Sequence, residues 1–337
     1  MSPAIVVEGL SKTYYRRKRA AGVLAGLRAY FSVAQEEVHA VRELDFRIEA
    51  GESVGLIGEN GAGKSSVVKM LTGILVPSRG EARTLGLNPW RERRRLARNI
   101  GVVFGQKPQL LWDIPAGESF KLLKGMYAIP DDVYRYTYGE AVERLELAEL
   151  LKTPVRLLSL GQRMRCDLAA ALLHAPLVAF LDEPTIGLDV LVKERVREFL
   201  REIRRRFGTT LLLTTHDLKD ITATCDRLIV LDKGRRLYDG DLRGFQDKFA
   251  SERSLLAELS DAPSTERRGE LERVLAGHAA RTTWESPLRV RVDFPNNGVT
   301  PRVTGLLLEH LSVQDLALQG TELDTIVAQL YKQASAT

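Results

Sequence analysis

The sequence predicts an α/β protein with a mostly parallel sheet, followed by a smaller α+β domain. Apolar, strand-like segments alternate with amphipathic helical segments up to about residue 240, as a parallel sheet with crossover helices requires. A glycine-rich loop at residues 58–66 joins one of these strands to a helix, and the order of strands and helices changes after Gly240. We therefore expect two domains, residues 1–240 and 241–337.

The composition is that of an ordinary globular chain. Of its 337 residues, 44% are hydrophobic and 28% are charged, and the formal net charge of +5 permits an anionic partner without requiring one. No apolar run approaches 18 residues, and the first basic run follows a short apolar run instead of preceding it. We therefore expect neither a membrane span nor a signal peptide. Cys166 and Cys225 lie in no paired motif and are expected to be free thiols.

Five strands of the first domain are clear from their apolar runs. Several of them are apolar without alternation, which is typical of strands that are covered on both faces. They are residues 52–58, 100–105, 177–182, 210–215 and 227–234.

Two segments interrupt this pattern. Residues 16–37, between a strand with Val6 and Val7 and a strand at about 40–48, are basic and, if helical, have one apolar face. Such an insert can lie on an anionic membrane surface or a partner, or it can pack on its own domain, and both alternatives stay open. The second segment, at about 113–165, is expected to form an inserted helical subdomain.

The second domain shows a different order of elements. Strands are expected at 254–260, 278–285, 288–294 and 312–318, and helices at 265–275, 300–310 and 322–332. The order β-α-β-β-α-β, with a last helix, predicts a ferredoxin-like domain. The sequence shows no cluster of metal ligands and no nucleophile with its base there, which favours an accessory role in dimerisation or regulation.

The loop Gly58–Ser66, with the sequence GENGAGKSS, matches the pattern G-x-x-x-x-G-K-[ST]. Its glycines allow consecutive N–H groups to curl around an anion, at the start of a helix whose dipole favours negative charge. Lys64 is expected to reach the outer phosphates, and the Ser65 hydroxyl to bind Mg²⁺. The loop therefore predicts a nucleoside triphosphate with Mg²⁺.

Side chains suited to hydrolysis follow other strands of the same sheet. Asp182 ends an apolar strand and is expected to bind Mg²⁺, and Glu183 is expected to activate the attacking water. His216, after the strand at 210–215, is expected to reach the γ-phosphate. Gln106, after the strand at 100–105, has an amide that can contact Mg²⁺ and the water.

A second helix start suited to anions lies at Ser159, Gly161 and Gln162, just ahead of a long helix. One triphosphate cannot easily use both helix starts of a single subunit. We therefore expect a head-to-tail dimer, in which the Gly58 loop of one subunit and the Ser159 segment of the other close over the same nucleotide.

Taken in order, these motifs resemble the ATPase subunits of ABC transporters over about residues 5–240. The resemblance implies a P-loop ABC ATPase domain with Gln106, Glu183 and His216 in catalysis, and with Ser65, Gln106 and Asp182 at the metal. The usual signature LSGGQ is LSLGQ here, with Leu160 in place of the first glycine. The residues that the resemblance implies at the nucleotide are Tyr14, Gly58, Asn60, Gly61, Ala62, Gly63, Lys64, Ser65, Ser66, Ser159, Gly161, Gln162 and Asp189, with Tyr15 as the alternative to Tyr14.

The segments FGQKPQLLWD and DEPTIGLD, with the ferredoxin-like domain, look most like the ABC-2 type export branch. This implies an ATP-hydrolysing motor, a homodimer of ATPase subunits, that drives export through separate membrane permease subunits. The permeases are expected to contact Lys107 to Trp112, and the basic insert to contact an anionic membrane. The expected location is peripheral, at the cytoplasmic face of the inner membrane. The substrate is not encoded in this chain.

The sequence supports two other functions less well. A soluble ABC ATPase that acts on ribosomes or nucleic acid is compatible with the basic insert, but such proteins commonly fuse two ATPase halves or carry long coiled coils, and neither feature is found in this sequence. A GTP-dependent switch would need an [NT]-K-x-D segment, which is absent from the sequence. We expect no nucleic-acid partner.

Overall fold

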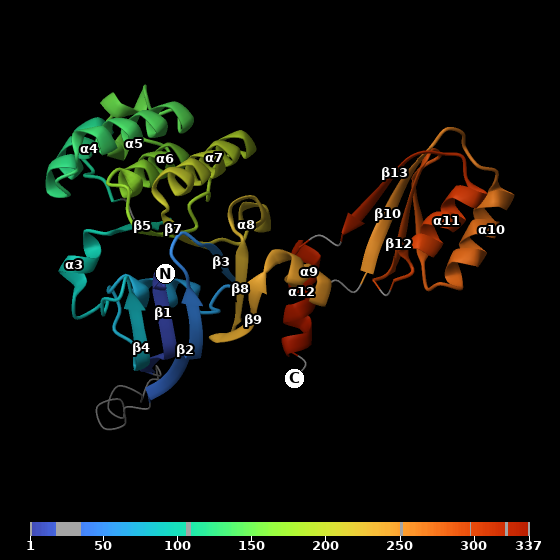
Figure 1. Ribbon diagram of the computed structural model, residues 1–337, viewed down its shortest axis with the longest axis horizontal. Helices are drawn as coiled ribbons and strands as arrows, with labels where there is room; N and C mark the ends of the chain where they lie inside the picture. Colours follow the sequence, from blue (N-terminus) through green and yellow to red (C-terminus); the bar gives the residue numbers. More distant parts are fainter. Residues whose placement is uncertain are drawn as a thin grey trace, which may run out of the picture. The chain divides into compact units, whose positions relative to one another are not determined.

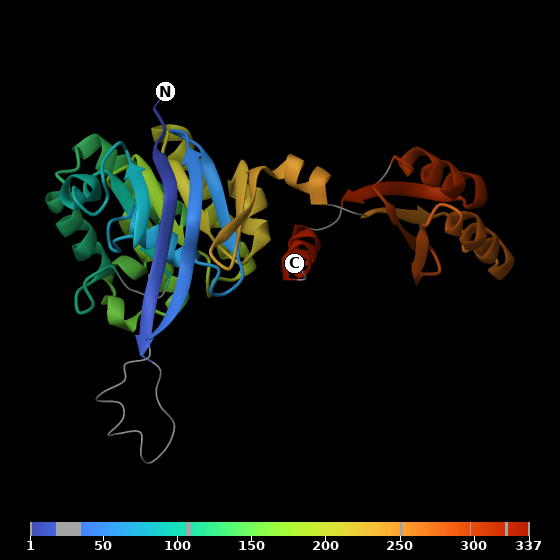
Figure 2. The ribbon, with the colours of Figure 1, turned by 90° about the horizontal axis from the view of Figure 1, so that it is seen from below.

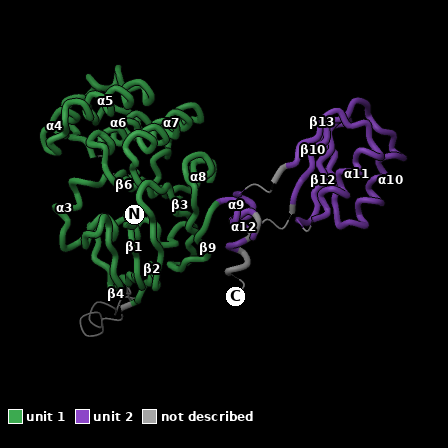
Figure 3. The backbone as a smooth tube through the Cα atoms, in the orientation of Figure 1, with its two compact units in different colours: residues 1–241 green, residues 242–337 purple. Residues whose placement is uncertain are grey.

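The computed structural model describes residues 2–17, 35–105, 109–249, 252–296, 298–320 and 323–335. The chain divides into two compact units, Met1–Asp241 and Leu242–Thr337 (Figure 3).

The first unit contains a six-stranded sheet in the order β5-β6-β7-β3-β8-β9 (Figure 1). β5, β6, β7, β3 and β8 run parallel, and β9 runs antiparallel to β8 at the edge. Because parallel strands end at the same edge, the residues that follow β5, β6, β7 and β3 meet there. The bounds are β3 Ser53–Gly58, β5 Ile100–Phe104, β6 Val178–Asp182, β7 Thr210–Thr214, β8 Arg227–Asp232 and β9 Arg235–Asp241.

A second sheet in this unit is antiparallel, in the order β2-β1-β4. Its strands are β1 Ile5–Arg17, β2 Gln35–Ile48 and β4 Arg79–Thr84. Helix α2, Lys64–Leu71, shares one buried core with both sheets. Val67 and Met70 of α2 lie in that core with Ile5 and Ile48 of one sheet and Leu56 of the other. Apolar packing from both sides therefore fixes the helix that follows the glycine-rich loop.

The long hairpin of β1 and β2 corrects the expected bounds of the basic insert. β1 and β2 lie side by side along their length (Figure 2), and their pairing continues to Arg16 opposite Glu36 and Arg17 opposite Gln35. The ends of the segment 16–37 are therefore strands and not helix. The β-favouring run of Thr13, Tyr14 and Tyr15 extends the ladder into the insert. Residues 18–34, the rest of the expected amphipathic helix, lie outside the described residues.

The helices α4, α5, α6 and α7 gather at one end of the first unit (Figure 1). α4 and α5 each follow a proline, Pro115 and Pro130, at the N-cap position. The bounds are α3 Arg93–Ala97, α4 Ala116–Met126, α5 Asp131–Arg144, η1 Leu150–Lys152, η2 Val155–Leu157, α6 Leu160–Leu172, α7 Val190–Phe207 and α8 Leu218–Thr224.

The second unit contains an antiparallel sheet in the order β11-β12-β10-β13. With the chain order β-α-β-β-α-β this is the ferredoxin-like arrangement, so the expected fold class is confirmed. Helices α10 and α11 share a buried core with the sheet. The short helix α9 was not expected from the sequence. The bounds are α9 Leu242–Phe249, β10 Glu252–Leu259, α10 Thr265–Ala276, β11 Arg281–Ser286, β12 Arg289–Pro295, α11 Thr300–His310, β13 Val313–Gly320 and α12 Leu323–Ser335.

Within the described ranges, every helix is too short or too polar to cross a membrane. Cys166 and Cys225 are free and buried. Burial raises the pKa of the Cys166 thiol to about 12 and that of Cys225 to about 11. Both cysteines are therefore structural, because a reactive cysteine needs an accessible thiolate.

Candidate nucleotide-binding site

The loop between β3 and α2 takes its shape from glycine. Gly61 and Gly63 have φ angles of +89° and +104°, in the left-handed region that other residues rarely adopt. A side-chain carbon on Gly63 would lie 2.3 Å from the carbonyl oxygen of Ala40, closer than real contacts allow. Among the described residues, no side chain caps the first N–H groups of α2. The helix N-terminus therefore offers hydrogen-bond donors to an anion.

Lys64, the first residue of α2, is buried and turns back onto the loop. Its Nζ donates to the carbonyl oxygens of Gly58 at 2.6 Å and Glu59 at 3.1 Å. Burial lowers the pKa of Lys64, while the charges of Glu183 and Asp182 act in the opposite direction. The amine thus lies within electrostatic reach of the carboxylates of Asp182, the last residue of β6, and Glu183, the next residue.

The other expected residues of the loop differ in exposure. Asn60 is exposed at the tip, Ala62 is buried, and Ser65 and Ser66 are half-buried in the first turn of α2. Ser65 is the residue directly after Lys64, so its hydroxyl lies at the helix N-terminus that the loop presents.

Tyr14 lies on the strand that passes this loop. Its hydroxyl is 3.3 Å from the Ser66 Oγ, and the Lys12 amine lies 5.4 Å from the centre of its ring. Tyr14 and Tyr15 are both exposed, but successive side chains of a strand point to opposite faces. The contact with Ser66 therefore places Tyr14, and not its neighbour, on the side of the glycine-rich loop.

One threonine that sequence analysis missed binds both acidic residues at the end of β6, the first through its carboxylate and the second through its backbone. Thr214, at the end of β7, donates a hydrogen bond from its hydroxyl to the Asp182 Oδ1. Its carbonyl oxygen accepts from the Glu183 N–H at 2.9 Å. Glu183 has a φ of +58°, in the left-handed region that residues with a side chain seldom adopt.

His216 and Glu183 form a pair. The His216 Nδ1 lies 2.7 Å from the Glu183 Oε2. The histidine side chain is 70% exposed and the glutamate side chain 25% exposed, so the pair faces outward from the sheet edge. The structure therefore brings together two residues that are 33 positions apart in the sequence because they follow the adjacent strands β6 and β7.

The order of the strands shows how the acidic residues, His216 and the glycine-rich loop lie relative to one another. β7 lies between β6 and β3, so Thr214 and His216 come between the acidic pair and the glycine-rich loop. β5 lies on the other side of β6, and the Gly105 N–H donates to the Asp182 carbonyl oxygen at 2.9 Å. Gln106 and Lys107 follow directly and lie outside the described residues, so their roles stay predictions.

A second group of expected residues forms around the N-terminus of α6. The Ser159 Oγ accepts from the Gln162 N–H at 3.2 Å, and the Gln162 Oε1 accepts from the Ser159 N–H at 2.9 Å, which is a capping box. A side-chain carbon on Gly161 would lie 3.1 Å from the Gly187 carbonyl oxygen. Asp189, two residues further, caps α7 by accepting from the Val192 N–H at 2.9 Å.

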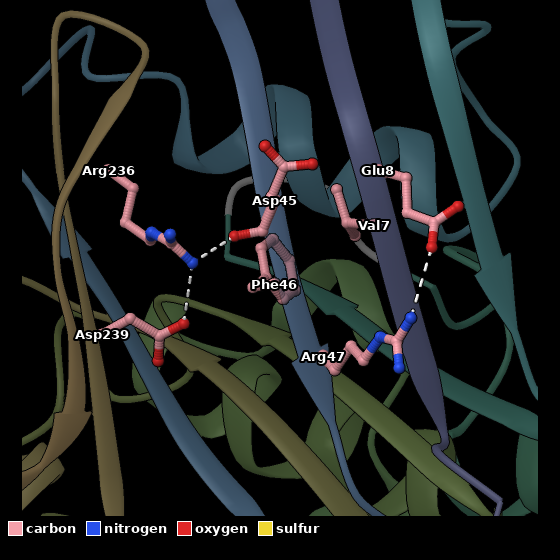
Figure 4. Close-up of a pocket in the computed structure, with 7 residues that line it drawn as sticks. All are labelled: Val7, Glu8, Asp45, Phe46, Arg47, Arg236 and Asp239. Carbon is pink, nitrogen blue, oxygen red and sulfur yellow. Dashed lines mark hydrogen bonds and ion pairs between the residues drawn. The ribbon is translucent and has the colours of Figure 1, made fainter.

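A cavity of about 300 Å³ lies outside both groups (Figure 4). β1, β2 and β9 supply its lining residues. Four of its charged groups form two ion pairs, with Arg47 3.4 Å from Glu8 and Arg236 3.2 Å from Asp239. None of the expected nucleotide residues lines it, and we assign it no part in nucleotide binding. The lining residues are Val7, Glu8, Asp45, Phe46, Arg47, Arg236 and Asp239.

Fold and site together define a P-loop ATPase. The family model described as "ABC transporter" matches residues 41–186. The ABC transporter ATP-binding protein NatA of Bacillus subtilis is 31% identical over 222 residues, which cover 66% of this chain and 90% of the relative. The daunorubicin/doxorubicin resistance ATP-binding protein DrrA of Streptomyces peucetius is 31% identical over 295 residues, which cover 86% of this chain and 87% of the relative.

The Nod factor export ATP-binding protein I of Neorhizobium galegae is 38% identical over 201 residues, which cover 59% of this chain and 57% of the relative. Among solved structures, the dimeric post-hydrolysis state of the ATP-binding cassette MJ0796, bound to ADP and Pi, is 26% identical. It has a TM-score of 0.59 and covers 71% of this chain and 99% of that chain. The chain therefore belongs to the family of ABC transporter ATP-binding proteins.

This result confirms the resemblance inferred from the motifs, including the export branch. The chain is an ATP-binding and ATP-hydrolysing subunit of an ABC-2 type transporter. The alternative of a soluble ATPase acting on ribosomes or nucleic acid is not favoured, because two of the relatives are named as an ABC transporter protein and an export protein.

Proposed function

We propose that two copies of this chain form the motor of an exporter, in which ATP binding closes the dimer and hydrolysis reopens it. The observation that carries the proposal is the convergence of Lys64, Asp182 and the Glu183–His216 pair at one edge of the sheet. Relatives of this chain are named for resistance to daunorubicin and doxorubicin and for export of Nod factor. The substrate moves through separate membrane permease subunits.

The residues on and beside the glycine-rich loop bind the nucleotide of their own subunit. The N–H groups of the loop and the Lys64 amine hold the phosphates, and the Tyr14 ring stacks on the adenine. Its position beside Ser66 supports this role for Tyr14. The residues assigned to this side are Tyr14, Gly58, Asn60, Gly61, Ala62, Gly63, Lys64, Ser65 and Ser66.

The oxygen donors of this group suit Mg²⁺. The Ser65 hydroxyl and the Asp182 carboxylate are hard oxygen ligands, and Mg²⁺ is usually held by one or two such side chains together with phosphate oxygens. The Thr214 hydroxyl fixes the Asp182 carboxylate, as a group that supports a metal ligand does. Gln106 is the third proposed ligand. A bound Mg²⁺ would neutralise charge on the phosphates.

Glu183 is the proposed general base. Its carboxylate accepts a proton from the attacking water, and His216 orients the carboxylate through the contact of 2.7 Å. The positive φ of Glu183 supports this assignment, since strained backbone is retained where function requires it.

The second group of residues contacts the nucleotide of the other subunit. Ser159, Gly161, Gln162 and Asp189 are assigned to it. Three apolar side chains beside them are unusually exposed, Leu160 at 45%, Val190 at 80% and Leu191 at 75%. Exposed apolar side chains next to polar binding residues support a surface that becomes buried in the dimer. A homodimer is the simplest assembly.

The membrane side of the assembly is also a proposal. The permeases contact Lys107 to Trp112, where Leu111 and Trp112 are exposed apolar side chains. The basic insert contacts an anionic membrane surface, and the chain lies peripherally at the cytoplasmic face of the inner membrane. The ferredoxin-like unit, from residue 242, is an accessory unit for dimerisation or regulation.

The substitution Glu183→Gln tests the catalytic assignment. It keeps the size of the side chain but removes the base, so the turnover of ATP should fall about 100-fold or more, while ATP binding stays within about twofold of wild type. Steady-state phosphate release and equilibrium ATP binding are measured on the purified full chain. Glu81→Gln, an exposed glutamate on β4, is the matched control and should behave as wild type. Wild-type turnover in Glu183→Gln would contradict the proposal.

A further inference from the structure

Asp220, a residue that no motif singled out, lies buried where three elements of the site meet. It belongs to α8, and it is 1% exposed. Its Oδ1 accepts two hydrogen bonds from the Arg197 guanidinium of α7, at 2.9 and 2.6 Å. Its Oδ2 accepts from the Thr185 hydroxyl at 2.5 Å and from the Thr215 hydroxyl at 3.3 Å.

The two threonines belong to the loops that carry the catalytic pair. Thr185 comes two residues after Glu183, and Thr215 comes directly before His216. One carboxylate therefore binds both loops at once. A change in the position of Asp220 would change the separation of Glu183 and His216, which are only 2.7 Å apart.

α7 makes a second link to the same loop. The Lys193 Nζ lies 2.6 Å from the Asp217 Oδ2, and Asp217 follows His216 directly. Lys193 and Arg197 are four residues apart, so they lie on one face of α7. The Asp217 N–H also donates to the Thr215 hydroxyl at 3.0 Å. The residues on both sides of His216 are thus held by the same face of one helix.

A second Arg–Asp pair of α7 is exposed, in contrast to the pair of Arg197 and Asp220. Arg204, further along α7, pairs with Asp226 at 2.5 Å, but these side chains are 30% and 59% exposed. A buried ion pair carries a large desolvation cost, and its geometry and hydrogen bonds decide whether it is retained. Asp220 receives four hydrogen bonds from three side chains, so its carboxylate is well satisfied. Unlike Asp226, it is buried, and two of its hydrogen bonds come from the loops that carry Glu183 and His216.

We propose that Asp220, held by Arg197, is a positioning residue that sets the geometry of the Glu183–His216 pair for ATP hydrolysis. The inference rests on the roles proposed above for that pair. Asp220 acts through Thr185 and Thr215, and it contacts neither the nucleotide nor the attacking water.

The test removes one hydroxyl without changing the shape of the side chain. Thr185→Val deletes the hydrogen bond to Asp220, and Thr185→Ser retains the hydroxyl. In Thr185→Val we expect kcat for ATP hydrolysis to fall about tenfold, because small displacements of catalytic groups are costly. KM for ATP should stay near wild type. The melting temperature should fall in Thr185→Val, because a buried carboxylate loses a hydrogen bond, and Thr185→Ser should restore both the melting temperature and kcat. All three quantities are measured on the full chain.

Thr215→Val repeats the test on the other loop, in case Thr185→Val does not fold. Asp226→Asn is the control, because it disrupts an Arg–Asp pair of the same helix that does not contact the catalytic loops, and it should leave kcat unchanged. Wild-type kcat in both valine variants would overturn the inference. So would a loss of kcat that Thr185→Ser does not restore, since packing alone would then explain it.

The outcome is separable from that of the proposed function. If Glu183→Gln abolishes turnover and Thr185→Val does not lower it, only the role of Asp220 fails. If Glu183→Gln turns over ATP like wild type, the assignment of the catalytic pair fails, whatever the threonine variants do.

Discussion

The N-termini of α2 and α6 carry similar residues, glycine and serine, but they satisfy their first N–H groups differently. α2 begins after Gly63 and, within the described part of the chain, has no side chain as a cap. α6 begins after Ser159, whose hydroxyl accepts from the Gln162 N–H in a reciprocal capping box. The start of α2 thus has no acceptor among the described side chains for its first N–H groups, whereas the capping box of α6 satisfies two N–H groups, those of Ser159 and Gln162.

The difference assigns a separate part in the proposed function to each helix end. In that proposal, the α2 end and Lys64 supply the main attraction for the phosphates in one subunit. The Ser159 hydroxyl is an acceptor in its cap and still has its own proton to donate. It can therefore add a hydrogen bond to a phosphate of the other subunit without losing the cap.

Gly63→Ala should have the largest effect, because it acts on the end that binds. Its φ of +104° and the 2.3 Å distance from a new side-chain carbon to the Ala40 oxygen force the loop to change. We expect the Kd for ATP to rise at least about 100-fold, which corresponds to about 2.7 kcal/mol. Isothermal titration calorimetry measures the Kd for ATP of the variant and of wild type.

The control for Gly63→Ala is Gly125→Ala in α4. Among the described atoms, nothing lies within 4 Å of the side-chain carbon that this change would add. Its Kd should equal that of wild type. Tight ATP binding in a folded Gly63→Ala variant would mean that the shape of the loop before α2 does not decide affinity. The proposal that the α2 end supplies the main attraction for the phosphates would then be wrong.

Ser159→Ala should have a smaller and different effect. Removing the cap should lower the free energy of unfolding by ~1 kcal/mol. Turnover of ATP should fall about tenfold, because a hydrogen bond to a charged phosphate oxygen is lost. The Kd for ATP should not change, since the α2 end is intact. Urea unfolding, phosphate release and titration measure the three quantities. A weaker Kd would indicate that both ends bind the nucleotide within one subunit.

Motifs predicted the parts of the site that depend on local sequence. The loop Gly58–Ser66 and the carboxylates Asp182 and Glu183 were found because each follows a recognisable strand. The ferredoxin-like order was readable because its strands and helices alternate at regular spacing. The cap of α6 was also readable, since Ser159 and Gln162 have the spacing of a capping box. Sequence analysis interpreted these residues as an anion site and did not identify the cap.

Tertiary contacts account for what was missed. Asp220 and Thr185 are 35 residues apart in the sequence, and Thr214 and Asp182 are 32 apart. Only the pairing order of β6 and β7 brings these residues together, and the sequence does not state that order. The same reason explains the long hairpin, because the pairing of Arg16 with Glu36 depends on strands that meet in three dimensions.

The central claim is that two copies of the chain close over a shared nucleotide. Sedimentation velocity of Glu183→Gln, with ATP and Mg²⁺ and with ADP and Mg²⁺ as the reference, tests it most directly. We predict a dimer that forms with ATP, dissociates with ADP, and is weaker when Ser159→Ala is added. An ATP-loaded Glu183→Gln chain that stays monomeric at high concentration, or a dimer indifferent to both nucleotide and Ser159, would contradict the account.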